Sequence, residues 1–109
     1  MNVIIITGAS EGIGAEMAKQ LARTKGAAVA LVLAARQAAK LEAVAAACRP
    51  HGAQVLCVPT DVSVRADCEA LIARTLQQFG RIDTLINNAG ISAHALLQDV
   101  DASHLGWYD

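Results

Sequence analysis

Residues 3–14 are Val-Ile-Ile-Ile-Thr-Gly-Ala-Ser-Glu-Gly-Ile-Gly, and the rest of the chain can be placed around them. The first four are an unbroken apolar run rich in β-branched side chains, which is typical of a buried strand. Three glycines follow, and apolar residues then recur at Ile13, Met17 and Leu21, which is helical spacing. The stretch therefore predicts a buried strand, a glycine-rich turn and a helix in direct succession.

This arrangement is suited to holding an anion. The first N–H groups of a helix have no partners within the helix and carry partial positive charge, so a pyrophosphate can satisfy them. We expect Gly8 to turn the chain off the strand, Gly12 to leave room beside the backbone for a ligand, and Gly14 to let the helix pack close to the strand. The Lys and Ser or Thr of a Walker phosphate loop are missing. The alternative is a tight turn that binds nothing.

Composition is that of one small globular domain. The chain has 109 residues, of which 54% are hydrophobic and 17% charged, and its mean hydropathy is +0.38. A net charge of −1 and a pI near 6.3 give no support for binding to nucleic acid or to an anionic membrane. The longest apolar run, residues 27–35, is far shorter than the roughly 18 residues of a membrane helix. No signal peptide is visible, so we expect a cytoplasmic protein.

The three cysteines are predicted to pack in the core and to have no redox or metal-binding role. Cys48, Cys57 and Cys68 are an odd number, are widely spaced and form no Cys-x-x-Cys motif. Each lies in an apolar stretch, so we expect reduced thiols in the core and no metal site.

Helices and strands alternate along the remainder of the chain. Helices are predicted over 13–24 and 38–49, and a third helix follows Ser63 as its N-cap and ends at Gly80. Strands are predicted at 28–34, 55–58 and 84–86. With right-handed crossovers, this order predicts an α/β fold, a Rossmann-like doubly wound parallel sheet of strand order 3-2-1-4 that ends after strand four.

The predicted sheet brings distant residues to one edge. Ligands of such sheets bind beyond the carboxyl ends of the strands, at the switch between strands one and four. Gly8, Arg36, Asp61 and Asn88 each follow the end of a strand. We therefore expect them to converge on one crevice.

Three motifs together carry a resemblance to a known family. They are Thr7-Gly8-x-x-x-Gly12-Ile13-Gly14, Asp61-Val62 and Asn87-Asn88-Ala89-Gly90, and residues 79–87 add a fourth matching stretch. In this order the motifs resemble the N-terminal half of a short-chain dehydrogenase/reductase. The resemblance covers all of residues 1–109, which we interpret as the N-terminal dinucleotide-binding part of a single domain of that family.

The resemblance implies a role for each motif. The phosphates and the adjacent ribose would be lined by Gly8, Ser10, Gly12, Ile13 and Gly14. The Asp61 carboxylate would accept a hydrogen bond from the adenine amino group, and the Val62 backbone would meet the ring. The nicotinamide-side ribose would be contacted by Asn88, Ala89 and Gly90. Taken singly, Asp61 could equally be a turn residue and Asn88 a polar strand end.

The residue after the second strand bears on the choice of cofactor. Folds that choose NAD place an acid about 20 residues after the glycines, to bind the ribose 2′-hydroxyl. Arg36 stands there instead and can bind a 2′-phosphate, so we predict NADP over NAD. Glu11 in the glycine turn argues against this choice, and Lys40 could assist it. The alternative for Arg36 is a solvated loop charge.

The catalytic half of the family pattern is missing from these residues. The resemblance implies a Ser, a Tyr and a Lys in the spacing Tyr-x-x-x-Lys, but the one tyrosine, Tyr108, has no such Lys after it, and Ser92 and Ser103 are misplaced for the serine role. We therefore expect a truncated chain that is inactive alone. The full-length parent would be an NADP(H)-dependent oxidoreductase of carbonyl or alcohol substrates, and a homo-oligomer. The alternatives are a non-catalytic nucleotide-binding module or an inactive fragment.

Overall fold

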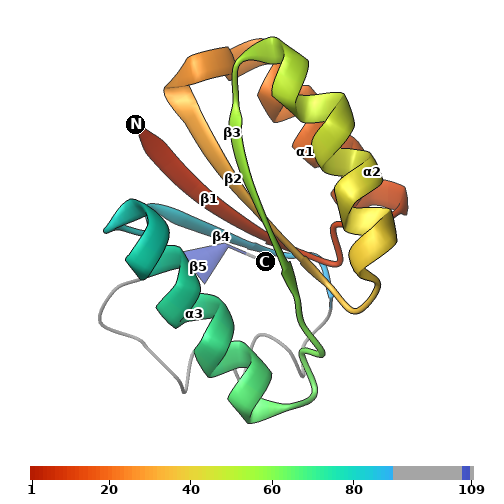
Figure 1. Cartoon of the computed structure of the whole chain (residues 1–109), viewed down its shortest axis with the longest axis vertical. Coiled ribbons are helices and arrows are strands. Elements are labelled where there is room, and N and C mark those ends of the chain that lie inside the picture. The colour runs from red at the N-terminus through yellow and green to blue at the C-terminus, as the bar shows by residue number, and fades with distance from the viewer. Residues whose placement is uncertain (90–106, 109) are drawn as a thin grey trace.

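The computed structural model describes residues 1–89 and the backbone of residues 107 and 108. Five parallel strands form one sheet in the order β3-β2-β1-β4-β5, with α1 and α2 on one face and α3 on the other (Figure 1). The strands are β1 (Asn2–Thr7), β2 (Val29–Ala35), β3 (Gln54–Pro59), β4 (Thr84–Asn87) and β5 (Trp107–Tyr108). The helices are α1 (Gly12–Lys25), α2 (Ala38–Cys48) and α3 (Arg65–Phe79), with 3₁₀ turns η1 (Gly26–Ala28) and η2 (Arg49–His51).

The predicted strand order 3-2-1-4 is confirmed, and the sheet extends one strand further than predicted. Leu85 of β4 pairs with Trp107, and Ile86 pairs with Tyr108. The prediction that the sheet ends after strand four therefore misses this two-residue strand. Two residues are too few to show a periodic pattern, so the sequence carries no signal for it.

The central strands are buried on both faces, as their unbroken apolar sequence predicts. Ile4 and Ile6 of β1 face the cluster formed with α1 and α2, whereas Val3 and Ile5 face the cluster formed with α3. Residues 29–34 of β2 alternate in the same way and are fully buried. At roughly 25 cal/mol per Å² of buried apolar surface, these two layers supply the main driving force for folding.

The fully buried positions of helix α1 are all small residues. Its buried positions are Gly14, Ala15, Ala18 and Ala22. Ile13 is 72% exposed, whereas Leu21 is partly buried against the core cluster, so only part of the stripe that predicted the helix packs on the sheet. Alanine has the highest helix propensity and lets the helix lie close to the sheet, which brings its N-terminus near the carboxyl end of β1.

The start of α3 differs from the prediction. Its N-cap is Val64, which makes no side-chain cap, and not Ser63. Ser63 instead donates hydrogen bonds to Asp61 from its N–H (3.0 Å) and from its hydroxyl (2.6 Å). The end at Gly80, in a left-handed conformation, is as predicted.

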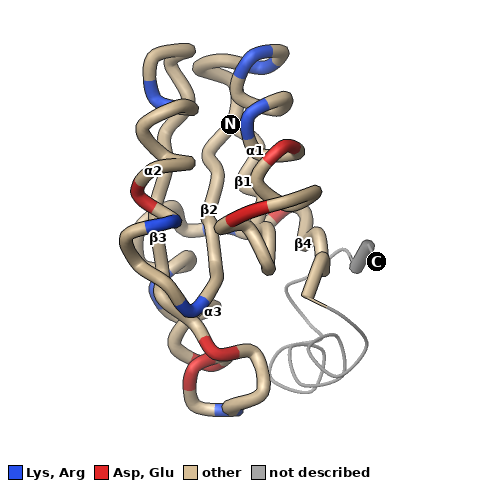
Figure 2. The backbone as a smooth tube through the Cα atoms, turned by 90° about the vertical axis from the view of Figure 1, so that its right-hand side faces the viewer, with Lys and Arg blue, Asp and Glu red and all other residues tan. Residues whose placement is uncertain are grey.

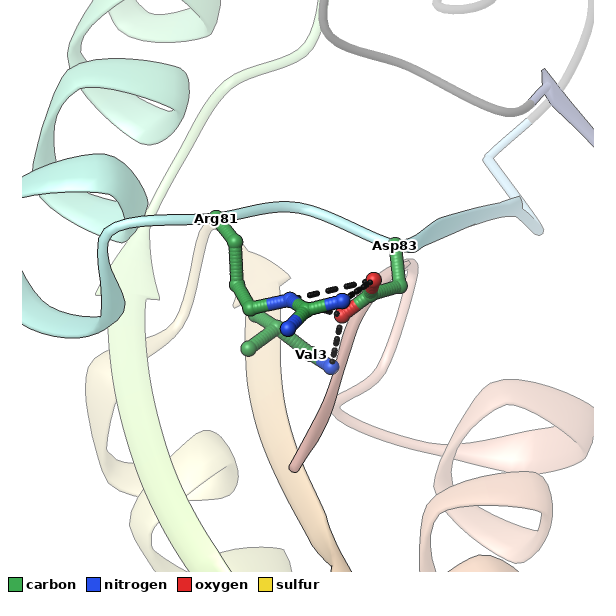
Figure 3. A network of polar contacts seen from close by, with 3 residues as sticks. All are labelled: Val3, Arg81 and Asp83. Carbon is green, nitrogen blue, oxygen red and sulfur yellow. Dashed lines mark hydrogen bonds and ion pairs between the residues drawn. The ribbon is translucent and has the colours of Figure 1, made fainter.

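A closed polar network ties β1 to the segment before β4 at the amino end of the sheet (Figure 3). The Val3 N–H donates to Asp83 Oδ2 at 2.8 Å, and the Asp83 N–H donates back to the Val3 carbonyl at 2.9 Å. The Arg81 guanidinium donates to both carboxylate oxygens, at 2.6 Å from Nη2 to Oδ1 and 3.0 Å from Nε to Oδ2. Hydrogen bonds from Arg81, and then from Val3, hold the pKa of Asp83 below its ordinary value.

The three cysteines are free thiols, of which Cys48 and Cys68 are buried and Cys57 is half-buried. Burial raises the pKa of all three, and burial together with the neighbouring Glu42 carboxylate raises the pKa of Cys57 to about 11. Within the described part of the chain, no three His, Cys, Asp or Glu side chains gather as metal ligands do. In that same part, no helix has the length and apolar character to cross a membrane.

Candidate functional site

A cleft of about 410 Å³ opens at the carboxyl ends of β1, β2 and β3. It lies where the sequence predicts a crevice, because parallel strands end at the same edge of a sheet. The residues that line it come from the end of β2, from the turns after these three strands and from the segment after β4: Gly8, Ser10, Glu11, Ala35, Arg36, Gln37, Thr60, Asp61, Val62, Ser63 and Ala89.

The glycine turn forms one wall of the cleft. Gly8 and Gly12 have φ angles of +63° and +62°, in the left-handed region that other residues rarely adopt. Gly14 is needed for a different reason: a Cβ there would lie 2.2 Å from the Gly8 carbonyl oxygen and 2.8 Å from the Asn88 side-chain nitrogen. The turn therefore folds tightly back on the start of α1.

The N-terminus of α1 faces the turn without a cap of its own. Glu11 occupies the N-cap position but makes no side-chain cap, and the first turn of the helix holds no acidic residue. Its N–H groups and the positive end of its dipole are thus available to an anion. The arrangement fits a pyrophosphate, since the glycines leave the backbone bare at this point.

Polar side chains fasten the glycine turn to β4. The buried Thr7 hydroxyl donates to Asn87 Oδ1 at 3.0 Å and accepts the N–H groups of Asn88 at 3.0 Å and Ala89 at 3.2 Å. The Asn88 side-chain amide donates to the Gly8 carbonyl at 3.3 Å. These bonds connect residues about 80 positions apart in the sequence, so β1 and β4 hold the turn in place together.

Asp61 is fixed in place by its neighbours. Besides the two bonds from Ser63 to its Oδ1, its own N–H donates to Asp67 Oδ2 at 2.8 Å. The hydrogen bonds from Ser63 hold the pKa of Asp61 below its ordinary value, with a smaller contribution from the positive charge of Arg36. Asp61 is therefore an anion at neutral pH, with one carboxylate oxygen already engaged.

Arg36 lies exposed at the rim of the cleft, beside Asp61. Among the described residues, none forms a hydrogen bond or an ion pair with its guanidinium. Lys40, one turn along, is different, because its Nζ lies 3.2 Å from Glu11 Oε2. Lys40 and Glu11 both line a second cleft of about 300 Å³ between the starts of α1 and α2.

The predicted site residues separate into three groups. Those that line the main cleft are Gly8, Ser10, Arg36, Asp61, Val62 and Ala89. Four others surround it: Gly12 lines the second cleft, Ile13 is exposed, Gly14 is packed beneath the turn, and Asn88 is bonded to Gly8. Gly90 lies outside the described residues.

Five lining residues were missed by the sequence prediction. They are Glu11, Ala35, Gln37, Thr60 and Ser63. All five are sequence neighbours of predicted site residues, so including the residues that flank each motif would have found them.

The comparisons with known proteins agree with this geometry. The family model described as short chain dehydrogenase matches residues 2–107. The chain belongs to the short-chain dehydrogenase family. It is 44% identical over 100 residues to 11-beta-hydroxysteroid dehydrogenase A of Sesamum indicum, and 42% identical over 101 residues to dehydrogenase/reductase SDR family member 7 of Homo sapiens. The first match covers 91% of this chain and 28% of the relative, and the second covers 89% and 29%.

Solved short-chain dehydrogenases share the fold. An enzyme of this family from Burkholderia phymatum, in complex with NAD, superposes with a TM-score of 0.85 at 29% identity, over 95% of this chain and 44% of that one. The alcohol dehydrogenase of Thermococcus sibiricus, complexed with 5-hydroxy-NADP, superposes with a TM-score of 0.71 at 36% identity, over 78% and 35%. The two structures hold different nicotinamide cofactors. The chain spans less than a third of the length of the two curated relatives above.

Proposed function

We propose that residues 1–109 form the dinucleotide-binding part of an NADP(H)-dependent oxidoreductase. Membership of the short-chain dehydrogenase family supports oxidoreductase chemistry. The bound nicotinamide would supply or accept a hydride, and a carbonyl or alcohol compound would be its partner. A cytoplasmic location and a homo-oligomeric whole protein complete the proposal, and these two points rest on sequence and resemblance alone.

The residues around the main cleft have separate tasks in this proposal. The bare N-terminus of α1 would hold the diphosphate. Asp61, already oriented by Ser63, would accept a hydrogen bond from the adenine amino group. Asn88 and Ala89, fastened to Thr7 and Gly8, would contact the ribose next to the nicotinamide, with Gly90 following them.

The preference for NADP over NAD rests on Arg36. It follows β2, where an acid would bind the 2′-hydroxyl of NAD, and no described residue neutralises it by a hydrogen bond or an ion pair. A guanidinium can form two charge-assisted hydrogen bonds to a phosphate. Hydrogen bonds to charged groups contribute about 1.5–3 kcal/mol each. Because about 1.4 kcal/mol corresponds to a tenfold change in affinity, Arg36 alone is sufficient to set the preference.

Cofactor titrations test the proposal. We expect the chain to bind NADPH about tenfold more tightly than NADH, and Arg36→Asp to abolish this difference while NADH binding persists. Arg74→Asp on the exposed surface of α3 makes the same charge change away from both clefts and should keep the preference. An unchanged preference in Arg36→Asp would show that Arg36 does not set the choice between NADPH and NADH.

A second candidate is a nucleotide-binding module without catalysis. In residues 1–109 the one tyrosine, Tyr108, lies in β5, and no Tyr-x-x-x-Lys spacing occurs. The coding sequence that follows codon 109 distinguishes the two candidates. A downstream Ser followed in frame by Tyr-x-x-x-Lys supports the oxidoreductase, whereas a stop codon supports the module or an inactive fragment.

A further inference from the structure

Strand β3 is the last strand on one side of the described sheet. It pairs there only with β2, so its other side is an open edge (Figure 1). The N–H of Thr60, directly after β3, donates to the Ala35 carbonyl of β2 at 2.8 Å, so the backbone groups of Thr60 point into the sheet. Because this direction alternates along a strand, Val55, Cys57 and Pro59 present their backbone groups to the open edge. Such groups are a template for pairing with another strand.

A side chain from η2 covers part of this edge. Arg49 donates from Nη2 to the Val55 carbonyl at 3.3 Å and from Nη1 to Glu42 Oε2 at 3.3 Å. Glu42 belongs to α2 and also lies beside Cys57, where burial together with this carboxylate raises the pKa of the thiol. Arg49 is thus held by α2 over an acceptor of the edge strand.

These contacts give little folding stability by themselves. The side chains of Arg49 and Glu42 are 47% and 59% exposed, and pairs between exposed side chains contribute little to the free energy of unfolding. Their position matters more, because a carbonyl that is already bound to a guanidinium is less available to another strand. Charged side chains on edge strands are one means by which sheets avoid pairing with another chain.

The open edge is complementary to the same edge of a second copy. If two β3 strands lie antiparallel with Leu56 opposite Leu56, Val55 of each copy lies opposite Cys57 of the other. Each of these pairs exchanges both of its N–H···O=C bonds, since both residues point outward. Half of the bonds across residues 55–57 would therefore be accepted by the Val55 carbonyls, which Arg49 occupies.

We propose that the contact of Arg49 with the Val55 carbonyl is autoinhibitory and keeps the β3 edge from pairing with a second copy of this chain. Without it, two chains would join edge to edge into one continuous sheet. The proposal is independent of the nucleotide site, because Arg49 lines neither of the two clefts.

Replacement of Arg49 tests this proposal in the 109-residue chain. Arg49→Met keeps a long, flexible apolar side chain but has no donor. We expect it to lower the dissociation constant for self-association about tenfold, measured by sedimentation equilibrium, because the acceptors of half of the bonds become free. Arg23→Met is the matched control, because Arg23 forms a similarly exposed pair with Glu16 within α1. It should associate as the wild type does.

Hydrogen exchange at single amides shows whether β3 is the surface that associates. In the wild type, the N–H groups of Val55 and Cys57 should exchange faster than that of Val58, which points toward β2. In associated Arg49→Met, these two amides should become protected. The proposal is overturned if both are already protected in the wild type, or if Arg49→Met associates no more tightly than the wild type. An equal gain in Arg23→Met, or a gain without protection of the two amides, overturns it as well.

Discussion

The arginines at the two ends of the sheet differ in whether they have partners within the protein. At the amino end, Arg81 donates to both oxygens of Asp83, and Asp83 also holds the backbone of β1 (Figure 3). At the carboxyl end, Arg36 stands at the rim of an open cleft and forms no such bond with any described residue. Arg81 is thus satisfied within the protein, whereas Arg36 is left to face the cleft.

The overall charge of the chain hides this difference. Figure 2 shows residues of both charges spread along the tube, and the formal net charge is −1. A count of charges therefore does not distinguish Arg36 from the other exposed cations, whereas its place in the lining of the main cleft does. We interpret the amino end as a structural clamp, and the proposed ligand site lies at the carboxyl end.

The largest expected effect tests how tightly the carboxyl end is packed beneath its open cleft. Gly14→Ala would place a Cβ against the Gly8 carbonyl oxygen. This oxygen belongs to the backbone and cannot easily shift to relieve the clash. We expect a loss of about 3 kcal/mol in the free energy of unfolding, measured by urea denaturation, together with loss of nucleotide binding. Gly12→Ala is the control: a Cβ there meets nothing within 4 Å, so only the positive φ costs, about 1 kcal/mol. Equal losses in the two variants would contradict the described packing.

The next effect tests the clamp at the amino end. Asp83→Asn removes the charge that binds Arg81 and the Val3 N–H, so we expect it to lower the free energy of unfolding by about 1–2 kcal/mol. The nucleotide affinity of the folded chain should not change. Glu42→Gln, which breaks the exposed pair with Arg49, should cost at most about 0.5 kcal/mol. A change in nucleotide affinity in Asp83→Asn would contradict the view that the two ends of the sheet act independently.

The same carboxylate gives the clamp a pH dependence with a definite sign. The pKa of Asp83 is lowered in the folded chain from its ordinary value of 3.8, so the unfolded chain binds a proton first as the pH falls. The stabilisation by Asp83 is thus fully present above the ordinary pKa and is lost as the pH falls through the folded pKa. We expect the difference in unfolding free energy between wild type and Asp83→Asn to be constant near neutrality and to shrink below about pH 4. A difference that grows in acid would show the opposite linkage.

The smallest effect concerns Asp61 at the carboxyl end. Ser63→Ala removes the hydroxyl donor and leaves the backbone donor, so the pKa of Asp61 should rise part of the way toward its ordinary value. Carboxyl-detected NMR titration measures the shift. As the pH is lowered, the variant should therefore begin to lose 5′-AMP affinity at a higher pH than the wild type does. Ser63→Thr keeps the hydroxyl and should behave as wild type, and a shift of the same size in both variants would exclude the side-chain bond as its cause.

Much of the fold could be predicted because its signals are local. The apolar runs of β1 and β2 are recognised within single elements, and both are buried in the structure. The same holds for α3, whose buried residues Cys68, Leu71, Ile72 and Thr75 recur at helical spacing. The alternation of helices and strands then leaves few topologies. The strand β5 could not be found in this way, because its two residues have no pattern and pair with a strand about 20 positions earlier.

The site was predictable to a similar degree and for a related reason. Gly8, Arg36 and Asp61 each follow a strand, and a parallel sheet brings such positions to one cleft. Interactions between different turns cannot be predicted from any single segment of the sequence. The Glu11–Lys40 pair and the use of Ser63 as a donor to Asp61, in place of a helix cap, depend on side-chain geometry that spacing alone does not specify.

The Thr7 hydroxyl has a consequence for the order in which the chain folds. It bonds to three successive residues of the segment at 87–89, and all three lie at least 80 positions downstream. A ribosome therefore makes the glycine turn well before the residues that support it, and closing so long a loop is slow. The glycine turn therefore acquires its described shape only when β4 has been synthesised and has paired with β1.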